Sequence, residues 1–160
     1  MARLVPDIDY VVRLEKLRDS YITAYPRQRM SVIRLRLEDH HFGPNRLVTS
    51  VSAVEAYSRC LALRRCSRTK DDLRRLYRRY RAASPKTMII EYLKVRGIDD
   101  PTAFFEEDNW KLFGYAEAYR NVLVHECTYL GLDVFPSLIE ACEAVLNKLE
   151  ELAGSHAKRT

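Results

Sequence analysis

Apolar residues recur at helical spacing along almost the whole chain, and this pattern most constrains what it can fold into. From about residue 7 to residue 25 the apolar positions follow the 3.6-residue period of an α-helix, which Pro26 should end. Residues 30–38 fit either helical turns or an alternating strand, and we favour the helix. The pattern predicts an all-α protein, built as an antiparallel bundle with short loops.

Local start and stop signals divide the middle of the chain. The break at Gly43-Pro44-Asn45 precedes a long helix expected over residues 46–65, whose apolar positions suggest burial on more than one side. Thr69 and Ser84 are expected to cap the next two helices, because their side chains can accept hydrogen bonds from free backbone N–H groups. Gly97 should end the second of these helices.

Similar signals define the last third of the chain. Asp100 should cap a short helix, and Asp108 or Asn109 a longer one reaching about residue 127. Gly131 marks the following turn. The segment Ser137–Glu140 has the pattern of a capping box, so we expect it to open a final helix that runs to Gly154.

Composition is that of a folded protein. With 160 residues, 47% of them apolar, the chain is expected to form one domain over residues 1–154 with a frayed tail at 155–160. No signal-peptide pattern or membrane-length apolar run is present, which predicts a cytoplasmic protein with no membrane contact. The four cysteines lack CxxC spacing, so we interpret them as reduced thiols in a helical core. The net charge of +5 permits an anionic partner.

The most informative segment for function is residues 119–126. It places Arg120, Asn121 and His125 among apolar neighbours in one predicted helix. Burying such groups is costly unless they are paired, so their presence there favours a role in chemistry or binding.

At 100° per residue, this helix shows two faces. One face is assigned to the core of the bundle: Leu112, Tyr115, Ala116, Tyr119, Val122 and Leu123. The other mixes aromatic, small and polar residues: Trp110, Phe113, Gly114, Glu117, Asn121, Val124 and His125. Arg120 lies at the margin and can reach the second face. Such a face suits packing on a second copy of the chain, with Gly114 allowing close approach, so we expect a two-fold dimer.

The Arg120-Asn121 pair, separated from His125 by three residues, resembles the R-x(4–6)-H signature of the HEPN superfamily (higher eukaryotes and prokaryotes nucleotide-binding). The all-α layout, with the motif late in the chain before a final helix, is similar too, and residues 47–57 resemble the long second helix of such domains. A second match, from Arg36 to His40 and His41, is set aside because charged residues surround it and a loop comes next.

The resemblance implies a metal-independent endoribonuclease, commonly a toxin or antiphage effector, without a metal or other cofactor. It implies that His125 moves protons, that Arg120 stabilises the charged phosphate, and that Asn121 orients the histidine or the phosphate. Glu117 would support Arg120 or Asn121. Glu55, on an otherwise apolar helix, could face the same cleft.

The resemblance also bears on partners. It implies RNA, a second copy of the chain and a possible antitoxin or other regulatory protein. Some antitoxin-controlled members carry a tyrosine two residues after the histidine as a site of nucleotide modification, but this chain has Cys127 there. No nucleotidyltransferase partner is therefore predicted.

Two other interpretations stay open. One is a non-catalytic HEPN module that binds RNA, a nucleotide or a partner protein, and another is a helical interaction protein with no role in nucleic-acid chemistry. An arginine-rich helix could follow an RNA backbone, although a charged helix face is more often simply solvated. The arginines concerned are Arg74, Arg75, Arg78 and Arg79.

Overall fold

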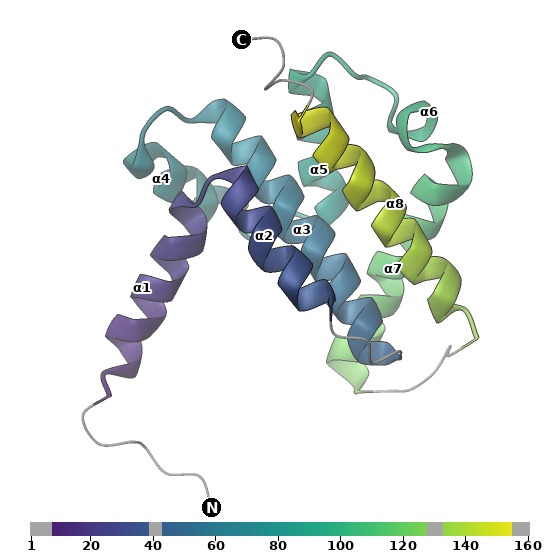
Figure 1. Ribbon diagram of the computed structural model, residues 1–160, viewed down its shortest axis with the longest axis horizontal. Helices are drawn as coiled ribbons and strands as arrows, with labels where there is room; N and C mark the ends of the chain where they lie inside the picture. The colour runs from purple at the N-terminus through teal and green to yellow at the C-terminus, as the bar shows by residue number, and fades with distance from the viewer. Residues whose placement is uncertain (1–7, 39–42, 128–132, 155–160) are drawn as a thin grey trace, which may run out of the picture.

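The computed structural model describes residues 8–38, 43–127 and 133–154, and within these ranges the chain is built from eight helices joined by short connections (Figure 1). This confirms the all-α prediction. The helices are α1 Tyr10–Thr23, α2 Pro26–Leu37, α3 Pro44–Cys66, α4 Lys70–Tyr80, α5 Pro85–Val95, α6 Pro101–Phe105, α7 Glu107–Glu126 and α8 Phe135–Gly154. No described helix has both the length and the apolar character needed to span a membrane.

The long helix α3 lies at the centre of the bundle. It packs against α2, α4, α5, α7 and α8 (Figure 1). Leu47, Val51 and Val54 on this helix are completely buried, and Leu61 is nearly so. Contact with neighbours on several sides explains why the apolar positions of α3 are not confined to one stripe.

The predicted caps of α4, α5 and α6 are confirmed. The side chain of Thr69 accepts a hydrogen bond from the backbone N–H of Asp72 at 3.1 Å, and Ser84 accepts one from Thr87 at 3.2 Å. Asp100 does the same for α6. Gly97 follows α5 with a φ of +78°, a backbone conformation that favours glycine, and so ends the helix as expected.

Two predicted helix starts are wrong. The helix that carries the motif begins at Glu107, and neither Asp108 nor Asn109 is its cap. Instead Glu106, with a φ of +72°, forms the corner between α6 and α7. The final helix begins at Phe135, so Ser137 lies within its first turn. Burial of the Phe135 ring provides a physical reason for the earlier start. Gly131 lies outside the described residues.

The first helix extends away from the rest of the bundle (Figure 1) and packs against α4. The Arg74 guanidinium on α4 binds both carboxylate oxygens of Asp19 on α1, at 2.6 and 3.1 Å. This bidentate pair fixes the C-terminal half of α1. Val11 and Leu14, towards its other end, are exposed.

Helix α2 settles the ambiguity of residues 30–38 in favour of the helix. Its inner residues Met30, Ile33 and Leu37 are buried at helical spacing. On its flank, Arg34 bonds to Glu143 at 2.5 Å and to Glu150 at 2.8 Å, both on α8. The final helix is thereby tied to the second.

Candidate functional site

Arg120 is held by partners on two helices. Its Nη1 donates to Oε2 of Glu55 on α3 at 3.0 Å, and its Nε donates to Oδ1 of the neighbouring Asn121 at 3.0 Å. The Arg120 side chain is only 17% exposed. Two hydrogen bonds and partial burial therefore restrict the guanidinium to one orientation at the edge of the bundle.

Glu55 is the central carboxylate of this site. Its other oxygen, Oε1, accepts a hydrogen bond from Nη2 of Arg59 at 2.7 Å, one turn further along α3. A single carboxylate thus pairs with two arginines, and its side chain is 22% exposed. Because partners 65 residues apart in the chain cannot be read from periodicity, the sequence could only indicate Glu55 as a possible cleft residue.

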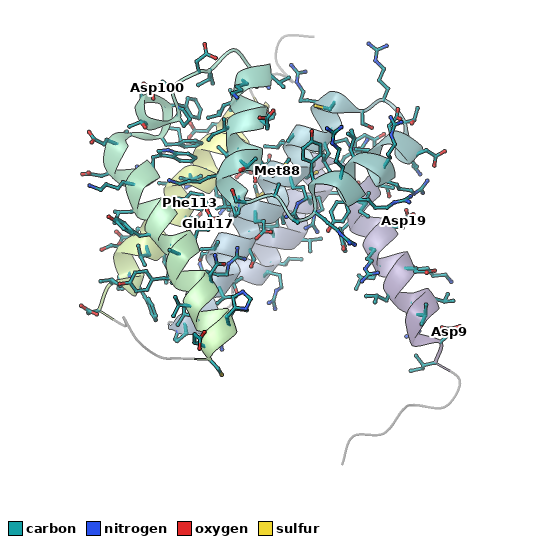
Figure 2. The ribbon with its side chains drawn as sticks, turned by 180° about the vertical axis from the view of Figure 1, so that it is seen from behind. Asp9, Asp19, Met88, Asp100, Phe113 and Glu117 are labelled. Carbon is teal, nitrogen blue, oxygen red and sulfur yellow. The ribbon has the colours of Figure 1, made fainter. Side chains whose placement is uncertain are left out.

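Glu117 lies one turn before Asn121 on α7 and is partly buried (Figure 2). Burial raises the pKa of its carboxyl, and this effect outweighs the positive charges of Arg120 and Lys86, which lower it. Among the described residues no hydrogen bond orients Arg120 from Glu117. The geometry gives that role to Glu55 and leaves Glu117 acting on Arg120 through charge.

Asn121 and His125 are exposed and lie four residues apart, so they share one side of α7. His125 is in the last turn of this helix, where the backbone dipole favours a positive charge. Cys127, the first residue after the helix, has a left-handed φ of +48° and ends it. Arg120, Asn121 and His125 therefore lie along the last turns of one helix, with the arginine packed inward and the other two open to solvent.

The predicted faces of α7 need correction. Phe113, placed on the outer face, is completely buried and stacks on Trp110, with ring centroids 6.0 Å apart. Tyr115 and Val122, assigned to the core, are 51% and 49% exposed. The core arc is thus rotated from the predicted one, because α3, α6 and α8 contact the helix from a different side than periodicity alone suggested.

The arginine-rich helix α4 has two different ends. Arg74 forms ion pairs within the protein, one with Asp19 and one with Asp71 at 2.8 Å. Arg75 pairs with Asp72 at 2.9 Å. Arg78 and Arg79 lie in the last turn of the helix, towards solvent. The positive charge open to an anionic partner is therefore concentrated at the C-terminal end of α4.

Arg36 and the four cysteines are the other residues that the sequence singled out. Arg36 is exposed near the end of α2, and its possible partners His40 and His41 lie outside the described residues. The four cysteines are free thiols, but Cys66 and Cys127 are exposed, so the prediction that all of them lie in the core is wrong for these two. Within the described ranges, no cluster of three His, Cys, Asp or Glu side chains is arranged to hold a metal ion.

Comparison with known proteins gives no match to a family model, a curated protein or a solved structure. The chemistry open to this chain must therefore be inferred from its own residues and their geometry.

Proposed function

We propose that this protein is a metal-independent endoribonuclease of the HEPN type, acting as a toxin or antiphage effector. Arg120, Asn121 and His125 from two subunits would form its active site in a shared cleft. The observation that carries the proposal is the arrangement on α7: a fixed arginine beside an exposed asparagine and an exposed histidine.

The state of Arg120 suits a residue that stabilises developing charge. Glu55 and Asn121 hold two of its nitrogens, and the planar guanidinium keeps further N–H donors that can bind phosphate oxygens. Because the group is fixed before substrate arrives, little reorganisation is needed when charge develops on the phosphate.

His125 suits the proton transfers. Its exposure lets a ribose hydroxyl or a leaving oxygen approach the ring, and an imidazole can both accept and donate a proton. In the proposed reaction the 2′-hydroxyl gives up its proton and attacks the adjacent phosphorus. The bond to the 5′-oxygen breaks, and that oxygen takes a proton. The products are a 2′,3′-cyclic phosphate and a 5′-hydroxyl, and no water or metal is consumed.

The exposed surface of α7 supports a dimer. Tyr115, Val122 and Val124 are each about half exposed, at 51%, 49% and 54%, and they lie on the same helix as the polar residues of the motif. Burying such apolar side chains against a second copy is favourable, and a two-fold axis near α7 would bring two sets of motif residues together.

The test is cleavage of RNA by purified protein in the presence of a chelator, with analysis of the product ends. Wild type should produce 2′,3′-cyclic phosphate ends, and His125→Ala should be at least about a hundredfold slower, since general acid–base catalysis contributes about 10²–10⁴-fold. Glu126→Ala, which changes the exposed neighbour, is the matched control and should cleave as wild type does.

Two results would contradict the proposal. Equal cleavage by wild type and His125→Ala would remove the motif from the chemistry. Salt-dependent RNA binding without cleavage by any variant would instead favour the non-catalytic module, and Arg78 and Arg79 would then be the first residues to change.

A further inference from the structure

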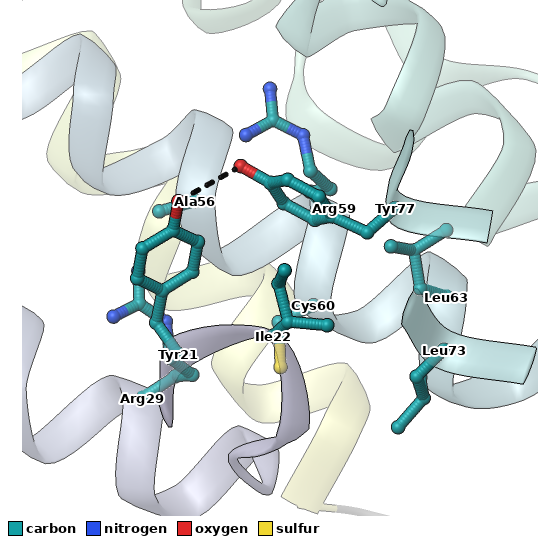
Figure 3. A pocket seen from close by; sticks show the side chains of 9 residues that line it. All are labelled: Tyr21, Ile22, Arg29, Ala56, Arg59, Cys60, Leu63, Leu73 and Tyr77. Atoms are coloured by element: carbon teal, nitrogen blue, oxygen red, sulfur yellow. Dashed lines mark hydrogen bonds between the residues drawn. The ribbon is translucent and has the colours of Figure 1, made fainter. Parts of the chain in front are cut away.

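A cavity of about 50 Å³, partly open to solvent, lies where α1, α2, α3 and α4 meet (Figure 3). Tyr21 on α1 and Tyr77 on α4 stand side by side in it, and the Tyr77 hydroxyl donates to that of Tyr21 at 3.4 Å. Arg29 on α2 and Arg59 on α3 also line it. Four helices thus contribute polar groups to one small space.

Arg29 brings to the cavity a positive charge that the lining does not balance, whereas the charge of Arg59 is met by Glu55 outside the lining. The two arginines are accompanied by tyrosines, apolar residues and Cys60, and no carboxylate is among the described lining residues. Burial raises the pKa of the Cys60 thiol to about 11, so the thiol is neutral at physiological pH. Arg29 lies over the Tyr21 ring, with its Cζ 5.5 Å from the centroid, and forms no ion pair with any described residue.

Arg59 is held by two acceptors that lie outside the lining of the cavity. Its side chain is 11% exposed, and its Nη2 is used by Glu55 at 2.7 Å and by the backbone oxygen of Arg81 at 3.4 Å. Its Nε is buried and has no partner among the described residues. Because this Nε has almost no accessible surface, a ligand in the cavity would meet the outer guanidinium nitrogens of Arg59 and not its Nε.

We propose that this cavity binds a phosphate group, either as inorganic phosphate or as the phosphate of a small monoester. Arg29 supplies the unbalanced charge, the Arg59 guanidinium and the hydroxyl of Tyr21 supply directed hydrogen bonds, and the limited volume selects a small ligand. Because Arg59 shares Glu55 with Arg120, the site is one carboxylate away from the motif of α7.

The test is isothermal titration of the full chain with inorganic phosphate and, separately, with adenosine monophosphate, at constant ionic strength. Wild type should bind at least one of them saturably at one site. Arg29→Gln should weaken that binding about tenfold, as expected for one lost charge-assisted contact. Arg27→Gln removes the same charge from an exposed position two residues earlier and should leave the affinity unchanged.

Tyr21→Phe is a second variant that keeps the ring and the net charge but removes the hydroxyl, and it should also weaken binding. Tighter binding of adenosine monophosphate than of inorganic phosphate would identify a monoester as the source, and equal or weaker binding would identify free phosphate. The proposal is overturned if wild type binds neither, or if Arg27→Gln loses as much affinity as Arg29→Gln. Because no RNA is present, this result is independent of the ribonuclease proposal.

Discussion

The bridging carboxylate of Glu55 gives the sharpest test of the site's architecture. In Glu55→Gln a neutral amide replaces a group that accepts charge-assisted bonds from Arg59 at 2.7 Å and from Arg120 at 3.0 Å. The amide has a single oxygen to accept with, and its NH₂ would face a guanidinium. The variant thus leaves two largely buried arginines without their counter-charge.

The cost can be estimated from burial. Removing one partner of a fully buried pair costs about 3–5 kcal/mol, and exposed pairs contribute about 0–1 kcal/mol. The three side chains here are 11%, 17% and 22% exposed, which places the site between these limits but nearer the buried one. We expect Glu55→Gln to lower the free energy of unfolding by about 2–3 kcal/mol.

Urea denaturation monitored by circular dichroism measures this change. For a chain of this size, such a loss also lowers Tm by roughly 5–10 °C. Glu151→Gln, at an exposed position of α8, is the matched control and should change stability by less than about 0.5 kcal/mol. If the two variants were equally stable, Glu55 would not hold Arg120 and Arg59 as described.

Three other parts of the molecule give further predictions. Phe113→Ala should lower the free energy of unfolding, measured by urea denaturation, by about 3–5 kcal/mol, and Tyr115→Ala by under about 1 kcal/mol, because only the ring of Phe113 is buried. The reverse order would support the faces of α7 assigned from periodicity. Asp19→Asn should speed proteolysis within α1 because it removes the bidentate partner of Arg74, while Glu15→Gln on the same helix should not. Arg74 lowers the pKa of Asp19. Wild type should therefore lose this protection as the pH falls below 3.8 and through the lowered pKa. Burial raises the pKa of Glu117 above 4.5, so just above that pH the folded state binds more protons than the unfolded state, and stability falls as the pH rises. In urea denaturation at a series of pH values, Glu117→Gln should remove this part of the dependence of stability on pH. An unchanged dependence would count against burial as the cause.

Local signals in the sequence are enough to predict most of the helices. Thr69, Ser84 and Asp100 act as caps because an N-cap needs only a side-chain oxygen and the backbone two or three residues away. The start of α7 escapes prediction because the corner at Glu106 depends on a left-handed backbone that nothing in its side chain favours. The start of α8 escapes it because burial of Phe135 depends on tertiary contacts.

The sequence shows that the three candidate residues share one helix, but it does not show their partners. The Arg120–Asn121–His125 pattern can be recognised within one helix, whereas its pairing with Glu55 joins α7 to α3 across the bundle. The exposed arc of α7 is not predictable either, since Tyr115 and Phe113 are both aromatic and periodicity does not say which one meets the core. In the same way, the pairing of Arg74 with Asp19 joins two helices and depends on folding that composition cannot reveal.

Subunit mixing tests most directly the proposal that two subunits contribute to each active site. Wild type and His125→Ala are co-expressed in known ratios, and RNA cleavage in chelator is measured against the wild-type fraction. If each shared cleft needs the histidines of both subunits, activity varies as the square of that fraction, and an equal mixture retains about a quarter of the wild-type rate. A linear dependence, with about half of the rate retained in the equal mixture, would contradict the shared cleft.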